Sequence, residues 1–489
     1  MIVTRPDGRY GGRPMAGVGE RHEPTWSRRR FLQLGALGLA ALTGACSSNA
    51  GEGAQELDAD VVVIGAGVAG LTAAARLQAE GRRVVVLEAR PRIGGRVATD
   101  RSLGVPFDVG ASWIHGTTGN PLTAVAEAAG ATTRPLDGDD VVAFDQGGRR
   151  WSESELARAE AEFNDLLERL AAHGRPGVSF GEVLAEIEPG WLDDRLRALV
   201  VSTYLTFDTG GLDQLSSTLY DEGAVFEGSE VVLTDGYDRI AEHLGRGVAV
   251  RLGEPVHRIE TTGSTVTVHG ATQRLRAGAA IVTVPLGVLK AGSIDFRPPL
   301  PAAKQEAIES VGFNRVEKFL FQWERPFWDD ADVIAYSAAR RDLFNYFINL
   351  ERLRPGSAAL LTFAYAEEAV RSDQRSDAEL TQLVLEHLRD LYGPQVPAPI
   401  AVRRSRWGAD PFARRAYSFT AVATELSHFD VLAQPVGRLH FAGEHTHREH
   451  FSTVHGAYLS GQRAADRTAG ALTRRTGQAR SAYPAFHRR

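Results

Sequence analysis

The sequence predicts an α/β protein in which a parallel-sheet domain is interrupted by an inserted α+β domain. The chain has 489 residues, more than a single hydrophobic core usually serves. Residues 58–64 form a short run of mainly β-branched residues that leads into a glycine-rich turn and an alanine-rich helix. Motifs that fit the same domain recur as far as residue 465, so the elements between them are expected to be insertions.

The turn after the first predicted strand is Gly65-Ala66-Gly67-Val68-Ala69-Gly70. Gly65 permits a tight turn, Gly67 lets the backbone approach a pyrophosphate, and Gly70 lets helix and strand pack closely. The helix is expected to run to about Ala79, with its N-terminal N–H groups directed at the phosphates. A second strand at residues 83–88 ends in Glu88, placed to bind ribose hydroxyls. This order indicates a Rossmann-type dinucleotide-binding unit.

The stretch that follows the acidic strand narrows the choice of dinucleotide. Ala89-Arg90-Pro91-Arg92-Ile93-Gly94-Gly95-Arg96 places a flexible glycine pair between arginines, which suits a second clamp on a diphosphate. With it the sequence resembles the family of flavin-containing amine oxidases, which carries an Arg-x-Gly-Gly-Arg stretch at this point. The resemblance implies FAD, a discontinuous, glutathione-reductase-like FAD-binding domain, and contact between Arg96 and the pyrophosphate.

The resemblance covers nearly all of the chain after residue 46. Residues 107–116 resemble the segment beside the flavin ring in polyamine oxidases, and Val256 matches a residue whose backbone meets the adenine. Glu444 matches an acid that binds a ribityl or pyrophosphate-side hydroxyl, and a helix after Thr453 points its N-terminus at the flavin carbonyl. The residues expected to contact FAD are Gly65, Ala66, Gly67, Gly70, Glu88, Ala89, Arg90, Arg96, Gly110, Ala111, Ser112, Trp113, Val256, Trp407, Gly443, Glu444, Thr453 and Val454.

These motifs divide the chain into domains. Residues 58–125, 227–295 and 401–475 are expected to form the FAD-binding domain, and residues 126–226 and 296–400 a substrate-binding domain over the cofactor. Within the second domain, residues 318–323 resemble a strand and Asp377–Tyr392 an amphipathic helix. Residues 47–57 are expected to be a linker and 476–489 a disordered tail.

Residues 1–46 have the pattern of an export leader. Residues 27–32 form a twin-arginine signal, and the apolar run at 32–42 is short for a membrane span. It ends at Cys46, the only cysteine, which resembles the acylation site of bacterial lipoproteins. We expect export by the twin-arginine (Tat) machinery to the outer face of the cytoplasmic membrane, the periplasm or the exterior, with a weak tether if Cys46 is acylated. An ordinary signal peptide or N-terminal anchor is the alternative.

The leader also changes the charge of the chain. It contains seven arginines and three acids, so its removal takes the formal net charge from −6 to −10. An acidic chain disfavours nucleic acid as a partner and mildly favours cationic substrates, although solubility alone also explains it.

The resemblance implies a reaction and three residues that take part in it. A hydride passes from the carbon next to an amine nitrogen to flavin N5, the imine hydrolyses, and O2 is reduced to H2O2. Lys318 lies in an apolar strand and matches a lysine that binds a water next to N5; a lysine reaching solvent is the alternative. His115 is expected to be an active-site polar group and Tyr417 one wall of an aromatic cage, with structural roles as the alternatives.

Departures from the monoamine oxidases shape the substrate prediction. Ala416 stands where those enzymes carry a flavin-linked cysteine, so FAD is expected to be non-covalent. Thr453 replaces the second cage aromatic, which favours the polyamine and spermine oxidase branch. A polyamine needs carboxylates along its path, and four acids are expected to line the entrance: Asp221, Glu222, Glu227 and Glu230. His445, His447, His450 and His455 lie close together in the sequence but lack the spacing of a zinc site, so no metal is expected.

The sequence therefore predicts an exported FAD-dependent amine oxidase that acts with O2 on a small-molecule, polyamine-type C–N bond. The enzymatic alternatives are an L-amino-acid oxidase, for which no arginine clearly answers to the substrate carboxylate, a monoamine oxidase-like enzyme, and a dehydrogenase with a membrane acceptor. A flavin-holding amine-binding protein is the non-enzymatic alternative. The leader disfavours a histone demethylase.

Overall fold

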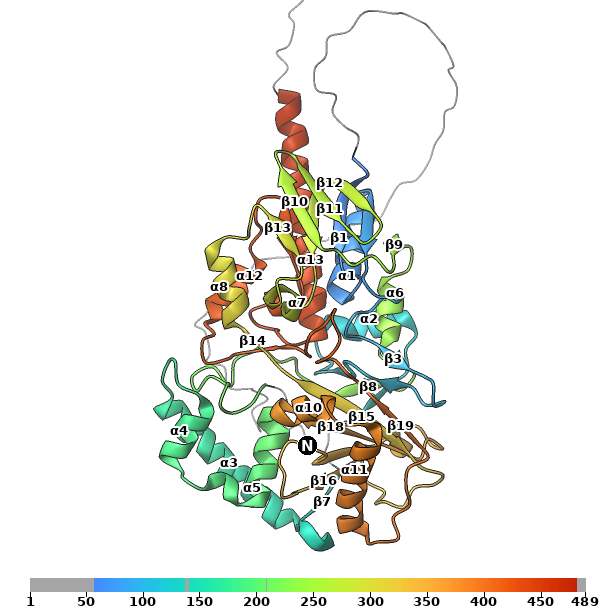
Figure 1. Cartoon of the computed structure of the whole chain (residues 1–489), viewed down its shortest axis with the longest axis vertical. Coiled ribbons are helices and arrows are strands. Elements are labelled where there is room, and N and C mark those ends of the chain that lie inside the picture. Colours follow the sequence, from blue (N-terminus) through green and yellow to red (C-terminus); the bar gives the residue numbers. More distant parts are fainter. Residues whose placement is uncertain (1–56, 137–139, 208, 482–489) are drawn as a thin grey trace, which may run out of the picture.

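The computed structural model describes residues 57–136, 140–207 and 209–481, and side chains to residue 473 (Figure 1). The predicted leader with Cys46 and nearly all of the predicted linker lie outside the described residues. None of the helices in the described part is both long and apolar enough to cross a membrane.

The first domain is built on an eight-stranded sheet in the upper half of Figure 1, called here the parallel-sheet domain. Parallel pairing joins β9 to β2, β2 to β1, β1 to β12 and β12 to β21, and β10 and β13 extend the sheet through the antiparallel strand β11. The strands are β1 (Ala59–Ile64), β2 (Val84–Leu87), β9 (Val250–Arg251), β10 (Arg258–Thr262), β11 (Thr265–His269), β12 (Arg274–Val282), β13 (Asp295–Arg297) and β21 (Leu439–Phe441).

Helices cover both faces of this sheet, which is why β1 is apolar at nearly every position. Val61 and Val63 face one core, and Val62 and Ile64 face the other. The first face is covered by α1 (Val68–Ala79), α2 (Pro121–Ala129), α6 (Asp238–Leu244) and α13 (Val454–Ser481). The second face is covered by α7 (Leu286–Lys290), α8 (Ala302–Ser310) and α12 (Leu426–Ala433).

The second domain is built on a six-stranded sheet in the lower half of Figure 1. Its order is β19-β15-β18-β17-β16-β7, antiparallel except for the β16–β7 pair. The strands are β7 (Val141–Phe144), β15 (Val316–Gln322), β16 (Val333–Tyr336), β17 (Tyr346–Asn349), β18 (Ala359–Tyr365) and β19 (Ala401–Arg404). Its helices are α9 (Leu350–Leu353), α10 (Ala366–Asp373) and α11 (Asp377–Tyr392).

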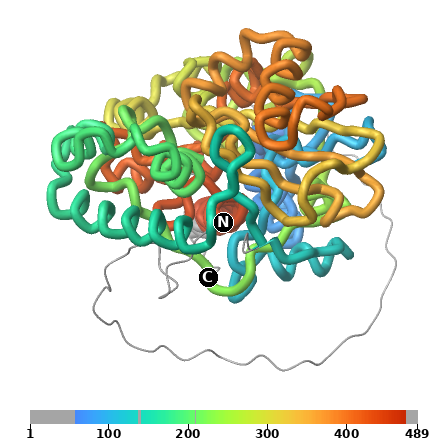
Figure 2. The backbone as a smooth tube through the Cα atoms, turned by 90° about the horizontal axis from the view of Figure 1, so that it is seen from below, coloured from blue at the N-terminus to red at the C-terminus, as the bar shows by residue number. Residues whose placement is uncertain are grey.

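A helical lobe lies to one side of this sheet (Figure 2). Its longest helix begins where Ser152 and Glu155 form a reciprocal capping box. The lobe consists of α3 (Glu153–His173), α4 (Phe180–Ile187), η2 (Trp191–Asp193), α5 (Arg195–Val201) and the π-helix η3 (Ser202–Thr206).

Short pairings complete the fold and join its parts. They are β3 (Thr99–Asp100) with β4 (Phe107–Asp108), β5 (Trp113–Ile114) and β6 (Thr133–Pro135) with β8 (Val231–Leu233), and β14 (Gly312–Phe313) with β20 (Ser418–Phe419). Two 3₁₀ turns are η1 (Gln146–Gly148) and η4 (Glu444–Thr446).

The predicted fold class is confirmed, and the predicted helices at residues 68–79 and 377–392 have the expected bounds. Three predicted domain limits fall inside elements or cores. α8 packs in the core of the parallel-sheet domain although it follows residue 296, and β19 pairs with β15 although it follows residue 400. α13 continues to Ser481, past the predicted end of that domain at residue 475.

Candidate active site

The glycine turn after β1 leaves the start of α1 as bare backbone. Gly65 has φ +104°, and a Cβ at Gly70 would lie 2.0 Å from the Gly65 carbonyl oxygen, so both positions require glycine. A Cβ at Gly67 would meet nothing nearer than the Gly94 oxygen at 4.0 Å. No side chain caps α1, so its first N–H groups are free to receive a phosphate.

Glu88 and the Gly94-Gly95 pair lie against this turn. The Glu88 carboxylate is 3% exposed and accepts hydrogen bonds from the backbone N of Ala66 at 2.7 Å and of Arg90 at 2.8 Å. The Gly94 N–H donates to the Ala66 carbonyl at 2.8 Å, so the Gly94-Gly95 pair packs against the Gly65–Gly70 turn. The predicted dinucleotide elements therefore meet at one edge of the sheet.

Three other predicted contact residues lie near this edge. Half-buried Ala89 follows Glu88, two residues after the end of β2, and the Arg90 guanidinium bonds Asp410 at 2.8 Å. Val256 lies in the loop before β10, and that loop is held at the edge because the Glu254 N–H donates to the Glu88 carbonyl at 2.8 Å.

Arg96 and Glu444 form the centre of a buried polar network. Arg96 Nη1 donates to Glu444 Oε1 at 2.8 Å and to the Ala416 carbonyl at 2.7 Å. Glu444 is 4% exposed and also accepts from the Ser418 hydroxyl and from the Ser452 N–H. Burial raises the pKa of this carboxyl, but Arg96, His445 and Ser418 together outweigh burial, so the net pKa lies below the ordinary value.

The last predicted flavin motif brings the start of α13 to this network. Gly443 has φ +132° and precedes Glu444 directly. The Thr453 hydroxyl accepts from the Gly456 N–H at 2.9 Å, so Thr453 caps α13, and Val454 is its first residue. The positive end of the helix dipole therefore lies beside a carboxylate and the polar groups bound to it.

The segment 110–113 passes between Arg96 and Trp407. A Cβ at Gly110 would lie 1.8 Å from the Arg96 carbonyl oxygen, and the Ala111 N–H donates to that oxygen at 3.2 Å. The Trp407 indole donates to the Val109 carbonyl at 2.7 Å. These contacts fix the residues that follow, Ser112 and Trp113.

Lys318 on β15 points at this segment and is 7% exposed. Its Nζ donates to Ser112 Oγ at 2.5 Å and to the Asp108 carbonyl at 3.3 Å, and lies 5.1 Å from the Trp113 ring centroid. Burial lowers the pKa of Lys318 to about 8. The alternative of a lysine that reaches solvent from a strand edge does not describe this side chain.

The carboxyl group of Asp108 was not singled out from the sequence. It accepts from Thr99 Oγ1 at 2.5 Å and from the Tyr237 N–H at 2.9 Å. Burial raises the pKa of this carboxyl to about 6. Asp108 lies within the predicted flavin segment, but nothing in its neighbours along the chain marks it as the residue beneath Lys318.

Aromatic rings pack beside the Lys318 ammonium, whose Nζ lies 5.1 Å from the Trp113 ring centroid and 5.8 Å from that of Phe363. Phe207 stands 5.1 Å from Phe363 and 5.2 Å from Tyr365, and 6.4 Å from Trp113, by ring centroids. The Tyr417 hydroxyl donates to the Phe207 carbonyl, which brings the predicted cage residue into the same cluster. The Trp113 indole nitrogen is buried and has no partner among the described residues, so a bound group or water must accept from it.

His115 comes two residues after Trp113, and its side chain is 40% exposed. Its Nδ1 is 2.7 Å from Glu230 Oε2, and the Gly116 N–H donates to Glu230 Oε1 at 3.2 Å. Of the four acids expected at an entrance, Glu230 is thus turned to His115, while Glu222 and Glu227 are exposed. In the part of the chain that the structure describes, no three His, Cys, Asp or Glu residues gather as a metal site would need.

These residues fit a bound FAD. Bare glycine turns at the start of α1 suit the pyrophosphate, Glu88 suits a ribose, and Arg96, Glu444 and the start of α13 continue the same polar surface. The unpartnered indole of Trp113 marks the far end of that surface, beside Lys318. Ala416 offers no nucleophile to a flavin, and its carbonyl is bound to Arg96.

The chain matches the family described as flavin containing amine oxidoreductase over residues 68–201 and 204–469. Polyamine oxidase 4 of Oryza sativa subsp. japonica is 33% identical over 429 residues, which cover 83% of this chain and 88% of the rice protein. Lysine-specific histone demethylase 1B of Mus musculus is 34% identical over 439 residues, which cover 84% of this chain. That match takes in 52% of the demethylase, so the chain spans about half of its length.

Among solved structures, wild-type putrescine oxidase bound to putrescine aligns with a TM-score of 0.71 at 22% identity. The alignment covers 84% of this chain and 99% of that chain, so the two proteins share the whole two-domain fold.

Proposed function

Because the chain belongs to the family of flavin-containing amine oxidoreductases and is an FAD-dependent amine oxidase, we propose that it oxidises a polyamine. The observation that carries the proposal is the buried Lys318 ammonium beside the aromatic cluster. It lies at the end of the polar surface that fits FAD. The rice relative, which is a polyamine oxidase by name, supports the substrate class. FAD, held without a covalent link, supplies the hydride acceptor that O2 reoxidises.

The aromatic residues prepare the amine for oxidation. The partly exposed rings of Trp113 and Phe207, backed by the buried rings of Phe363 and Tyr365, offer little hydration to an ammonium. An amine bound against them has a depressed pKa and more readily loses its proton. Ring faces also attract whatever cationic part of the substrate remains. The predicted role of Tyr417 as one wall of this site is consistent with its bond to Phe207.

Lys318 is proposed to donate and accept a proton beside the reacting carbon. Ser112 Oγ and the Asp108 carbonyl fix its Nζ, and a pKa of about 8 lets it exchange a proton near neutral pH. It would hold the water that hydrolyses the imine. His115 and Glu230, toward solvent, are proposed to receive a second ammonium of the polyamine.

Anaerobic mixing with candidate amines tests the proposal. Spermine, spermidine and putrescine should each be compared with L-amino acids, following loss of flavin absorbance and then peroxide release on admitting O2. Bleaching by polyamines is the expected result. Bleaching by L-amino acids alone would reject the polyamine substrate, and binding of amines without bleaching would indicate a flavin-holding binding protein.

An N-methylated lysine is the second candidate substrate. The mouse relative at 34% identity is a lysine-specific histone demethylase by name, and an N-methyl amine offers the same kind of C–N bond. A dimethyl-lysine peptide belongs in the same panel. Faster bleaching by the peptide than by every polyamine would favour this substrate.

We also propose that the protein is exported by the twin-arginine route, on the pattern at residues 27–46, which lie outside the described residues. That route carries folded proteins, so FAD would be loaded in the cytoplasm before export. A fusion sent through an unfolded-chain route should then arrive without flavin. Full loading of that fusion would contradict the proposal.

A further inference from the structure

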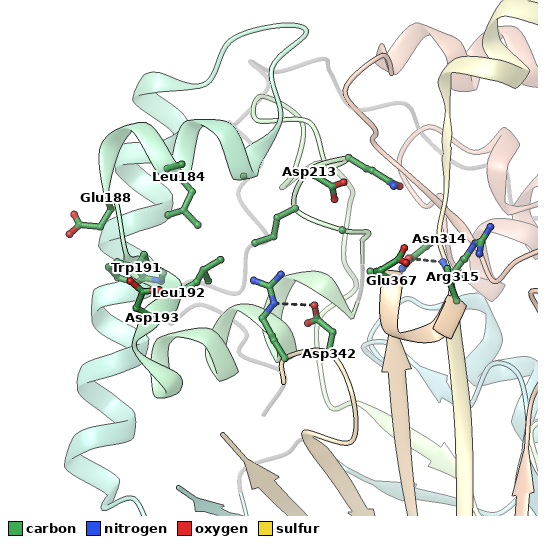
Figure 3. A pocket seen from close by; sticks show the side chains of 18 of the residues that line it. Leu184, Glu188, Trp191, Leu192, Asp193, Asp213, Asn314, Arg315, Asp342 and Glu367 are labelled. Carbon is green, nitrogen blue, oxygen red and sulfur yellow. Dashed lines mark hydrogen bonds and ion pairs between the residues drawn. The ribbon is translucent and has the colours of Figure 1, made fainter. Parts of the chain in front are cut away.

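A cavity of about 890 Å³ lies between the helical lobe and the connection from β14 to β15. Figure 3 shows Leu184, Trp191 and Leu192 on the lobe side and Asn314 and Arg315 on the other. None of the residues predicted to contact FAD lines it, and neither Lys318 nor any ring around it does. The cavity is therefore separate from the proposed amine site.

One wall of the cavity carries two arginines that form no ion pair among the described residues. Arg315 and Arg415 both line it, and neither has a carboxylate within ion-pair distance among the described residues. Arg415 uses one nitrogen to bond the Phe313 carbonyl at 3.0 Å. Burial, and then the charge of Arg315, lowers the pKa of Arg415, so the two guanidinium groups lie close enough to repel.

The same wall holds a buried donor without an acceptor. Asn314 is 3% exposed; its Oδ1 accepts from the Arg315 N–H at 2.7 Å, but its Nδ2 has no partner. Buried amide groups nearly always find an acceptor, so the free Nδ2 indicates one supplied from outside the chain. Arg341 repeats the pattern: its Nε bonds Asp342 at 3.0 Å, while its buried Nη1 has no partner.

Acids also line the cavity, but several are already engaged. Glu188 bonds Arg169 at 2.8 Å, and Asp342 bonds Arg341 and accepts from the Ser202 hydroxyl at 2.6 Å. Asp193, Asp213 and Glu367 complete the acidic part of the lining. Asp193 lies with Trp191 and Leu192 on the lobe side, whereas Glu367 stands beside Asn314 and Arg315 (Figure 3) and pairs with Arg371 at 3.9 Å. The lobe side suits an apolar or cationic portion of a ligand, and the arginine pair suits its anionic end.

We propose that this cavity binds a small ligand through an oxyanion, a carboxylate or a phosphate, held by Arg315, Arg415 and the Nδ2 of Asn314. Planar guanidinium groups and an amide donor match the geometry of such oxygens. The ligand would also act on the amine site. The Asn314 N–H donates to the Tyr417 carbonyl at 2.7 Å, and its carbonyl accepts from the Ala416 N–H at 2.9 Å, so backbone hydrogen bonds join the site to the predicted cage residue Tyr417.

Calorimetric titration of the FAD-loaded protein, without any amine, tests the site. The probes are inorganic phosphate and succinate, which distinguish the two oxyanion sources, with a tetramethylammonium salt as the cationic control. Asn314→Asp keeps the acceptor for the Arg315 N–H and replaces the free donor by a negative oxygen. Arg415→Gln removes one charge, and Arg158→Gln, at an exposed position on α3, is the matched control.

The expected result is saturable binding of at least one anion with a shift in flavin absorbance. Asn314→Asp and Arg415→Gln should each weaken it about tenfold or more, since charge-assisted bonds are lost, while Arg158→Gln should not. Unchanged flavin spectra and melting temperatures establish that each variant is folded, and Arg315→Gln replaces either one that is not. Absence of saturable binding at about 1 mM, or equal affinity in all variants, would overturn the proposal. Neither outcome depends on which amine is oxidised.

Discussion

Replacement of Lys318 by methionine removes a buried ammonium and keeps an unbranched side chain of similar length. Burial lowers the lysine pKa from 10.5 to about 8, which corresponds to a native-state cost of about 3 kcal/mol below pH 8 that methionine does not carry. Against this, Ser112 Oγ and the Asp108 carbonyl each lose a donor, at about 1–3 kcal/mol apiece. The terms nearly cancel, so the variant should fold and load FAD.

The effect should therefore appear in the chemistry. A positioned proton-transfer group contributes roughly 10²–10⁴-fold, and a slowing of at least tenfold is expected in either flavin reduction by the amine or reoxidation by O2. Lys318 is protonated below pH 8 and neutral above it, so the affected wild-type rate should change around that pH. The methionine variant should show no such change. Stopped-flow absorbance measures both half-reactions separately across this range.

Lys290→Met provides the matched control. Burial, with Arg415 nearby, also lowers the pKa of Lys290 to about 8, but its Nζ bonds the Glu309 carbonyl in another part of the molecule. This variant should keep both rates and the pH profile of the wild type. If Lys318→Met keeps them as well, at every pH and in both half-reactions, Lys318 has no place in the mechanism.

Other predictions concern the cofactor. Glu444→Gln leaves Arg96 without its buried counter-charge, at about 2–3 kcal/mol after allowance for the partial exposure of Arg96, and should lower the ratio of flavin to protein absorbance of the purified protein. Gly70→Ala sets a Cβ 2.0 Å from the Gly65 oxygen and should yield no flavin-loaded protein, whereas Gly81→Ala, with open space around it, should cost about 1 kcal/mol in a melting experiment and load normally. Heat or acid denaturation should release all FAD into the supernatant, because Ala416 offers no nucleophile; yellow precipitate would contradict non-covalent binding.

The dinucleotide unit could be predicted from the sequence because its determinants are local. Gly65, Gly67 and Gly70 act on the turn and helix that contain them, and Glu88 directly follows the next strand, β2. The apolar residues of β1 predict a strand that is covered on both faces, and in the structure helices cover both faces of the sheet. The family resemblance then supplied Arg96 and Glu444, which are 348 residues apart yet directly bonded.

The surroundings of Lys318 could not be predicted in the same way. Phe207, Phe363 and Tyr365 come from the helical lobe and from β18, and each is an ordinary apolar residue in its own element. Only the packing of the lobe against the six-stranded sheet brings them together. The domain limits fail for a related reason: β19 is assigned to its sheet by pairing with β15, a partner about eighty residues away along the chain.

Arg315 and Arg415, in the cavity beside the helical lobe, do not supply the carboxylate site that an L-amino-acid oxidase needs. Along β15 the even positions Val316 and Leu320 face the core that includes Phe363 and Tyr365, and the odd positions Phe319 and Phe321 face the other core. Lys318 is an even position, whereas Arg315 precedes the strand and lines the cavity, which Lys318 does not line; three residues of extended chain span about 10 Å. In an α-amino acid the oxidised carbon is bonded directly to the carboxylate, so a carboxylate held by Arg315 would keep that carbon in the cavity, away from Lys318. Arg315 and Arg415 therefore fit a ligand that accompanies the amine better than they fit the amine itself.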